Sequence, residues 1–376
     1  MILINKKIIV IKIFLILIPF AILEIVSQFV LLNFKDTGTS FFFRPFADKI
    51  IKSTIKKEYE INWDFSTNKM KPGKYLTKDG IVYNINSKGF RGREFTTKKE
   101  KIRIIAFGGS TTIGLESLDD QTYPVQLETL LNKNLNEYEV LNMGFGSKSL
   151  NFIRLLYFTE AHIYKPDFII IYSNRNNIMY DAGNVDLVLK NQVFTKVHYI
   201  FSENIMIYRL MSKSYKRFMN LNLKTNVYIS PYHLNGIKEF YFTNTYKEVL
   251  FDIISFAEKN NTKVILVKMA YNFPALNLNE LRKYSNEDLL KNYKNDFFKK
   301  KYNLDEVTLF WSVFGTILNN QIDDFKGNKN VIIVDPREDL EKNSKNFTDE
   351  IHLTPKGNSV LASSIYQALK INRKKN

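Results

Sequence analysis

The sequence predicts an α/β fold of three layers, in which helices cover both faces of a central parallel sheet. Short apolar runs typical of buried strands alternate with segments whose apolar residues recur at helical spacing. Turns rich in glycine or asparagine follow several of these runs. Of the 376 residues, 45% are hydrophobic, which suffices for a sizeable core. These observations favour one main α/β domain.

The predicted strands are apolar enough for the interior of a parallel sheet. In chain order they are Lys101–Phe107, Tyr138–Asn142, Asp167–Tyr172, Lys263–Met269 and Asn330–Val334. Apolar residues at helical spacing predict helices between and after them, at Tyr123–Leu135, Leu150–Tyr164 and Pro355–Leu369. In such a sheet a functional site lies beyond the C-terminal ends of the strands.

The N-terminal segment from Ile8 to Leu32 is mostly apolar and, at about 25 residues, is long enough to cross a bilayer. A cleaved signal peptide, an uncleaved anchor and a buried core helix are the alternatives. No good small-residue cleavage site follows the apolar run, so we expect an anchor. Lys6, Lys7 and Lys12 precede the apolar centre, which predicts a cytoplasmic N-terminus and an extracytoplasmic main domain, periplasmic or at the cell surface.

The chain is therefore divided into three parts. Residues 1–34 form the cytoplasmic tip and transmembrane anchor, residues 35–98 a stalk and lead-in segment, and residues 99–373 the main domain. An insertion at about 180–245, rich in Tyr, Asn, Lys and Phe, is expected to line a substrate pocket. Residues 270–303 are expected to form a second irregular stretch.

Composition argues against several classes of function. The formal net charge is +16, but the lysines are scattered and form no compact basic cluster interleaved with aromatic residues, so nucleic-acid binding is not expected. The absence of cysteine excludes disulfides and cysteine nucleophiles. Only four histidines occur, without an HExxH motif. We therefore expect no metal site.

The first candidate motif, Phe107–Thr112 (FGGSTT), ends the first predicted strand. Its two glycines permit a tight strand-to-helix turn that presents the Ser110 hydroxyl beside unpaired backbone N–H groups. A nucleophile needs this placement, and such N–H groups can stabilise an oxyanion. A phosphate-binding loop is disfavoured, because Leu115 and Glu116 stand where a P-loop needs Lys and Ser or Thr. A purely structural Gly-Gly turn is the other alternative.

Three further motifs follow later strands or precede the last helix. The glycines of Asn142–Ser149 can bring a backbone N–H close to a reacting carbonyl, and a side-chain amide of Ser173–Asn177 can donate to an oxyanion. Asp349 stands three residues before His352, where a carboxylate can orient the imidazole that accepts the proton of Ser110. Taken singly, these motifs also fit a glycine-containing loop, an Asn-rich turn and a surface pair.

In this order, the four motifs resemble the blocks of the SGNH (GDSL-like) hydrolase family over about residues 84–370. Gly89–Gly92, Tyr123-Pro124 and Leu127-Glu128 add a likeness to its single-span bacterial members. The resemblance implies a flavodoxin-like sheet order. It also implies a catalytic triad of Ser110, Asp349 and His352, and an oxyanion hole formed by Ser110, Gly146 and Asn176. Gly144 is the alternative to Gly146.

This sequence departs from the family pattern at three positions. Gly109 stands where the first block usually has Asp, and Asn174 and Asn177 replace the Gly and Asp of the third block. Asn174 is bulkier than glycine and could change the turn that aims Asn176. The departures therefore concern the oxyanion hole more than the nucleophile.

The resemblance implies a membrane-anchored extracytoplasmic serine esterase that works through an acyl-enzyme, without metal or organic cofactor. Its expected substrate is an ester, such as an O-acetyl group, on a cell-envelope glycan or lipid. Two alternatives are an O-acyltransferase that modifies exported polysaccharide with the same triad, and a non-catalytic envelope-binding module.

Overall fold

The computed structural model describes most of residues 69–181 and 242–373, together with short pieces of the N-terminal part and of the insertion. The described residues are 15, 18–27, 30, 63–64, 69–76, 80–134, 136–181, 201, 205–208, 210–211, 242–273, 276 and 278–373. The chain divides into two compact units, residues 1–71 with 193–222 and residues 72–192 with 223–376. Every candidate site residue lies in the second unit.

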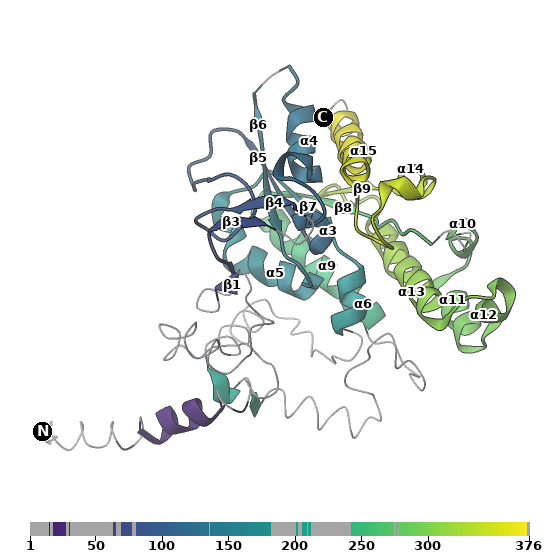
Figure 1. Ribbon diagram of the computed structural model, residues 1–376, viewed down its shortest axis with the longest axis horizontal. Helices are drawn as coiled ribbons and strands as arrows, with labels where there is room; N and C mark the ends of the chain where they lie inside the picture. The colour runs from purple at the N-terminus through teal and green to yellow at the C-terminus, as the bar shows by residue number, and fades with distance from the viewer. Residues whose placement is uncertain are drawn as a thin grey trace, which may run out of the picture. The chain divides into compact units, whose positions relative to one another are not determined.

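A five-stranded parallel sheet forms the centre of this second unit, with the strand order β6-β5-β7-β8-β9 (Figure 1). The strands are β5 Ile102–Gly108, β6 Tyr138–Gly144, β7 Phe168–Tyr172, β8 Lys263–Val267 and β9 Val331–Val334. All five predicted strands are confirmed, with ends shifted by no more than about two residues. The order is flavodoxin-like, and β6 and β7 flank β5 on opposite sides, so the crevice that binds ligands in such sheets falls between β5 and β7.

Helices cover both faces of the sheet, which confirms the three-layer α/β/α prediction (Figure 1). Helix α4 packs against α15 on one face, and α5 packs against α9 on the other; α13 continues the second layer beside α9. The helices of this unit are α3 Ser110–Ile113, α4 Tyr123–Leu131, α5 Leu150–Thr159, α6 Arg175–Asp181, α9 Phe242–Lys259, α10 Leu278–Leu281, α11 Asn286–Lys294, α12 Phe297–Tyr302, α13 Glu306–Ile322, α14 Arg337–Glu341 and α15 Pro355–Arg373.

Two helix predictions ran too far. Helix α4 stops at Leu131, because the Asn132 side chain bonds the backbone N–H and C=O of Tyr138, both at 2.9 Å, and turns the chain toward β6. The second predicted helix is interrupted at Glu160, after which 161–164 form a 3₁₀ turn. A polar side-chain contact thus ends the first helix, and a change of backbone conformation at Glu160 ends the second.

The prediction of an irregular stretch over 270–303 was wrong. This segment contains α10, α11 and α12, whose lengths are 4, 9 and 6 residues. Helices this short are marginal in isolation and show little periodicity in sequence; packing against α13 stabilises them here. The preceding α9 and the following α13 were also missed.

Part of the predicted lead-in packs with the main domain. Strands β3 Gly73–Leu76 and β4 Val82–Ile85 form an antiparallel hairpin, and Arg91 makes isolated β-bridges to Ile85 and to Asn142 of β6. The predicted boundary at 98 and 99 remains a prediction, as do the bounds of the other parts. Most of the predicted insertion at 180–245 lies outside the described residues.

The predicted N-terminal anchor lies largely outside the described residues. Residues 18–27 are helical, and the carboxylate of Glu24 is buried and accepts the backbone N–H of Met206 at 2.8 Å within the first unit. No helix in the part of the chain that the structure describes is both long and apolar enough to cross a membrane.

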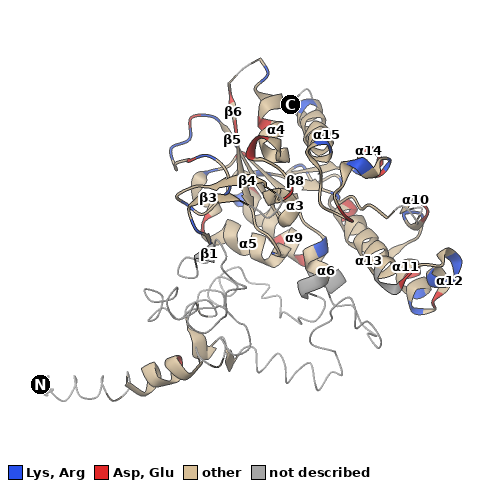
Figure 2. Cartoon of the chain, in the orientation of Figure 1, with Lys and Arg blue, Asp and Glu red and all other residues tan. Residues whose placement is uncertain are grey.

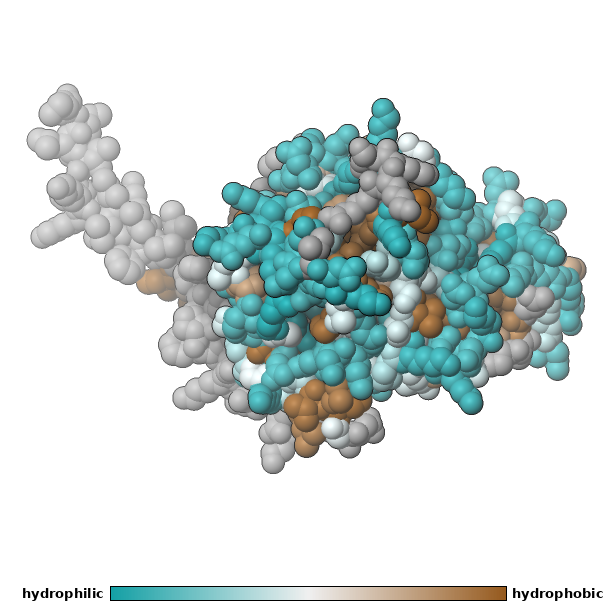
Figure 3. All heavy atoms as spheres, turned by 90° about the horizontal axis from the view of Figure 1, so that it is seen from above, coloured by the Kyte–Doolittle hydropathy of each residue, from teal (hydrophilic) through white to brown (hydrophobic). Residues whose placement is uncertain are grey.

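Charged residues of both signs are dispersed over the described chain in the view of Figure 2, apart from a run of lysines on α12, Lys299 to Lys301. On the face shown in Figure 3, hydrophilic side chains predominate and hydrophobic ones gather in small groups. The large apolar side chains instead fill the space between sheet and helices, as Phe107, Tyr123 and Phe314 do.

Candidate active site

Ser110 lies where β5 passes into α3, at the C-terminal edge of the sheet. Gly108 pairs with Tyr172 of β7, and a Cβ atom at position 108 would collide with the Tyr172 carbonyl oxygen and the Thr112 side chain. Only glycine permits this close approach of strand and helix. The tight turn therefore places the Ser110 hydroxyl between β5 and β7.

Replacing Gly108 with alanine is expected to lower the free energy of unfolding by at least about 1–3 kcal/mol, because a backbone carbonyl must move to admit the methyl group. Gly146→Ala is the matched control, since its Cβ would meet only the Leu115 Cδ1 atom at 3.9 Å. Urea denaturation followed by circular dichroism measures both. Equal midpoints for the two variants would contradict the steric argument.

The structure brings Ser110, His352 and Asp349 into one hydrogen-bonded chain. The Nε2 atom of His352 lies 2.7 Å from the Ser110 Oγ atom, and its Nδ1 atom lies 2.5 Å from Asp349 Oδ2. Because an ionised carboxylate only accepts hydrogen bonds, Nδ1 carries the proton. Nε2 is then the acceptor for the Ser110 hydroxyl, as a general base requires.

Asp349 is held ionised by its neighbours. Partial burial raises the pKa of this carboxyl, but the hydrogen bonds from the His352 ring and from the backbone N–H groups of His352 and Ile351 outweigh burial and hold the pKa below its usual range. The backbone N–H groups lie 2.7 and 2.8 Å from Oδ1. The two backbone N–H groups occupy Oδ1, so Oδ2 is the oxygen that accepts the hydrogen bond of the imidazole and orients the ring.

The backbone offers donors beside the serine. Ser110 is the first residue of α3, so its N–H has no partner within the helix. Gly144 is a poor candidate, because its N–H already donates to Asn142 Oδ1 at 3.0 Å and its Cα abuts the backbone of α3. Among the described residues the Gly146 N–H has no hydrogen-bond partner. Gly146 is therefore the better candidate of the two.

Asn176 lies against the turn that carries the serine. A Cβ atom at Gly109 would collide with the Asn176 Nδ2 atom, so glycine at this position makes room for this amide. Nδ2 donates one hydrogen bond to the carbonyl of Lys148 at 2.9 Å. An amide nitrogen has a second N–H, which remains for an oxyanion.

Replacing Asn176 with alanine is expected to lower kcat by about 10²–10³, as loss of one oxyanion donor does. Asn176→Asp should lower kcat at least as far, because a carboxylate of the same size cannot donate. Hydrolysis of p-nitrophenyl acetate measures both, with Asn295→Ala, an exposed asparagine after α11, as the control. A loss of less than about threefold would exclude Asn176 from the oxyanion hole.

The departures at Asn174 and Asn177 have structural roles. Asn174 is buried, donates to the Gly315 carbonyl and to Asn319 Oδ1 on α13 at 3.2 Å each, and accepts from the Tyr271 hydroxyl at 2.9 Å. Burial raises the pKa of Tyr271, so this hydroxyl stays a donor. Asn177 accepts the Leu150 N–H at the start of α5, at 3.1 Å.

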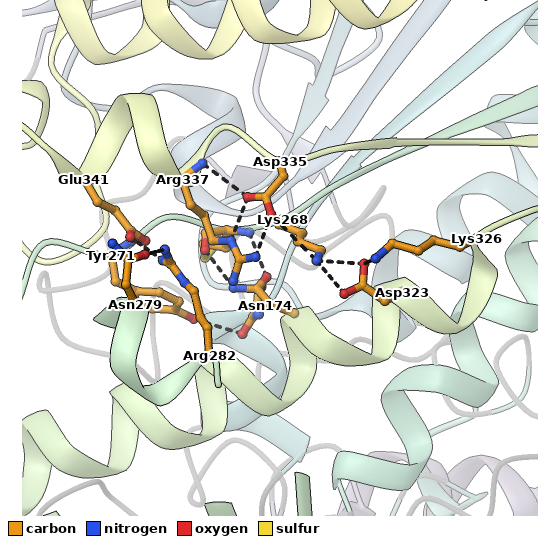
Figure 4. A network of polar contacts seen from close by, with 12 residues as sticks. Asn174, Lys268, Tyr271, Asn279, Arg282, Asp323, Lys326, Asp335, Arg337 and Glu341 are labelled. Carbon is orange, nitrogen blue, oxygen red and sulfur yellow. Dashed lines mark hydrogen bonds and ion pairs between the residues drawn. The ribbon is translucent and has the colours of Figure 1, made fainter. Parts of the chain in front are cut away.

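These contacts fix the segment on either side of Asn176 without occupying its amide. Figure 4 shows Asn174 and Tyr271 beside an ion-pair network whose members are Lys268, Asp323, Lys326, Asp335 and Arg337. A neighbouring ion pair joins Arg282 to Glu341 (Figure 4). The hydrogen bonds of Asn174 to Gly315 and Asn319 show that α13 accommodates the larger side chain at this position.

A residue not assigned from the sequence holds the other end of α3. Arg91 is buried and donates to the carbonyls of Ile113 at 2.9 Å and Ser117 at 2.6 Å, and also to the carbonyl of Gly114, while Asp119 neutralises its charge at 2.8 Å. The sequence showed it only as part of a family likeness. Its partners are 22 to 28 residues away in sequence, so only the fold reveals this contact.

The site opens into a shallow hollow with a cavity volume of only about 10 Å³. Besides Ser110 and Asn176, its lining includes Thr111, Arg175, Met269 and Ile351. Within the described residues, no group of three or more His, Asp or Glu side chains could hold a metal ion. The hydrogen-bonded serine, imidazole and carboxylate can perform nucleophilic attack on a small carbonyl group.

No protein-family model and no curated protein matches this sequence. Among solved structures, an acetyl xylan esterase named AlAXEase is 16% identical, with a TM-score of 0.41, covering 71% of this chain and 99% of its own. A GDSL-like lipase from Bacteroides thetaiotaomicron is 14% identical, with a TM-score of 0.39 and coverages of 72% and 89%. A variant of an acetyl xylan esterase from Geobacillus stearothermophilus is 12% identical, with a TM-score of 0.38 and coverages of 73% and 96%. These likenesses are too distant to decide the activity or the substrate of this chain.

Proposed function

We propose that this protein is a serine esterase of the SGNH type, with Ser110 as nucleophile. The observation that carries the proposal is the unbroken hydrogen-bond chain from Ser110 through His352 to Asp349. These residues come from two turns about 240 residues apart in sequence, beside a pocket that exposes the serine. A purely structural role would not require a serine, an imidazole and an ionised carboxylate in this geometry.

The reaction proceeds in two steps. Ser110 Oγ attacks the ester carbonyl while His352 Nε2 takes the hydroxyl proton, and the backbone N–H groups with Asn176 hold the oxyanion. The C–O bond of the ester breaks, and the leaving alcohol takes the proton from His352. Water, deprotonated by His352, then attacks the acyl-enzyme and releases the acid and the free serine. Asp349 stabilises the imidazolium in both steps.

The membrane location belongs to the same proposal. Lysines precede the apolar N-terminal segment, and the described helical residues 18–27 expose apolar side chains: Ile18, Ile22, Leu23 and Val26. Both features fit an anchor with a cytoplasmic N-terminus. An extracytoplasmic esterase held at a membrane meets cell-envelope glycans and lipids, and an O-acyl ester on one of them is the proposed substrate.

A fluorophosphonate probe tests the nucleophile. The full-length protein in detergent is expected to form one adduct, which peptide mass spectrometry locates on Ser110, because the probe reacts with activated serines. Product analysis with and without a glycan acceptor then separates hydrolysis from acyl transfer. A folded protein that forms no adduct would contradict the proposal and favour a non-catalytic binding module.

A further inference from the structure

Arg175 is a charged side chain in the pocket of Ser110 to which the reaction above assigns no role. It is the first residue of α6 and lines the same pocket as Ser110 and Asn176. Its side chain is 17% exposed. A guanidinium carries five N–H donors and a permanent positive charge. A guanidinium this far buried beside a reacting serine is stable only if its charge and its N–H donors find an anionic or hydrogen-bonding partner.

The described part of the chain provides no hydrogen bond to the Arg175 guanidinium, and its Nη1 atom is buried without a partner. In the described chain the buried arginines Arg91, Arg103, Arg154 and Arg337 and the half-buried Arg282 each meet a carboxylate at hydrogen-bond distance, although Nε of Arg154 and Nη1 of Arg337 also lack a hydrogen bond. Arg175 differs from them in having no carboxylate at that distance. Leaving a buried donor unpaired is costly, so the exception requires an explanation.

Two neighbours set the position of this guanidinium. Its Cζ atom lies 4.3 Å from the ring centroid of Trp311, a buried side chain of α13, so an aromatic platform holds it in place. The closest described carboxylate is that of Glu350, with Oε2 at 3.6 Å from Nη1. That distance exceeds a hydrogen bond, and Glu350 is 53% exposed, so the pair is weak.

We propose that Arg175 is an anion-binding residue of the candidate active site, and that the substrate carries a carboxylate or phosphate group close to the ester that Ser110 attacks. That the bound anion is part of a substrate rests on the proposed esterase function. The binding of the anion to Arg175 does not. A planar guanidinium matches both oxyanions through two parallel hydrogen bonds. Contact with the Trp311 ring restrains the guanidinium before the anion arrives, which lowers the ordering cost on binding.

Glu350 has the opposite effect on the same ligand. It follows Asp349 in the turn that carries His352, and its charge opposes an anion that approaches Arg175. Removing this carboxylate should therefore strengthen anion binding, whereas removing the guanidinium should weaken it. The two substitutions form a matched pair with opposite expected signs.

The experiment titrates inorganic phosphate, and separately acetate, into the full-length protein in detergent by isothermal titration calorimetry. Arg175→Gln is expected to weaken the binding of the preferred anion by at least about tenfold, because the charge-assisted hydrogen bonds are lost. Arg175→Lys should keep part of the affinity, and Glu350→Gln should increase it severalfold. Lys299→Gln, on α12 and apart from α6 in Figure 2, removes one positive charge elsewhere and should change nothing.

A kinetic arm uses p-nitrophenyl acetate and the mono-p-nitrophenyl ester of succinate, which carries a free carboxylate. Wild type should prefer the succinate ester, and Arg175→Gln should lose that preference mainly through KM. Equal phosphate and acetate affinities in wild type and Arg175→Gln would overturn the inference, even if the probe labels Ser110. Anion binding that depends on Arg175 without labelling of Ser110 would leave the inference standing and reject the esterase.

Discussion

Replacing Ser110 with alanine is expected to abolish fluorophosphonate labelling and to lower kcat by about 10⁴–10⁶, because the Ser110 hydroxyl is the one bonded to the general base His352, whereas the Ser173 hydroxyl in the same pocket donates to Asn177. The fold should be unaffected, since the hydroxyl is bonded to His352 and caps no helix. Labelling is read by gel fluorescence and kcat by hydrolysis of p-nitrophenyl acetate.

A double substitution distinguishes this mechanism from background reactivity. Ser110 and His352 act as one unit, so the variant with Ser110→Ala and His352→Gln should be no slower than Ser110→Ala alone. Ser363→Ala, an exposed serine of α15, is the control and should label as wild type does. Labelling that persists in Ser110→Ala would show that another serine reacts and would reject the nucleophile.

Replacing Asp349 with asparagine is expected to lower kcat by about 10³–10⁴, because the amide can hold His352 in the wrong tautomer and cannot stabilise its cation. Binding of substrate should change little, so KM should remain near the wild-type value. Asp339→Asn, at an exposed aspartate of α14, is the control, since it removes a carboxylate charge without touching the imidazole hydrogen bond. A loss of less than about tenfold would show that His352 works without Asp349.

The same substitution is expected to change how the stability of the folded chain depends on pH. Since hydrogen bonds hold the pKa of Asp349 below its usual range, its ionisation stabilises the folded chain. That contribution is complete above about pH 5 and is lost as the pH falls from the ordinary aspartate value of about 3.9 through the lowered pKa. The difference in thermal unfolding between wild type and Asp349→Asn should therefore shrink as the pH falls below about 4.

The sequence by itself determined the architecture and the residues that meet in the site. Apolar runs identified all five strands of the sheet, because a strand buried on both faces excludes polar residues almost completely. The turn after the first strand and the Asp-x-x-His pair before the last helix pointed to Ser110 and His352, and the resemblance to the SGNH blocks added Asn176. Gly146 stays a prediction. The residue types that form a turn depend mainly on neighbouring positions in the chain, so they are visible in the sequence before the fold is known.

Only the tertiary structure decided the contacts between distant segments. The short helices of 278–302 depend on α13, so their own periodicity is too weak to predict them. In the sequence, Asn174 stands where the SGNH pattern has glycine, and its larger side chain could have misdirected Asn176. The structure shows how this side chain is held, by partners on α13 that are 141 and 145 residues away. That the Arg175 guanidinium has only a weak ion pair with Glu350 and no hydrogen bond within the described chain is likewise invisible in sequence, because this depends on every residue that surrounds it. Sequence determines which groups are available, and packing decides which of them remain free to act.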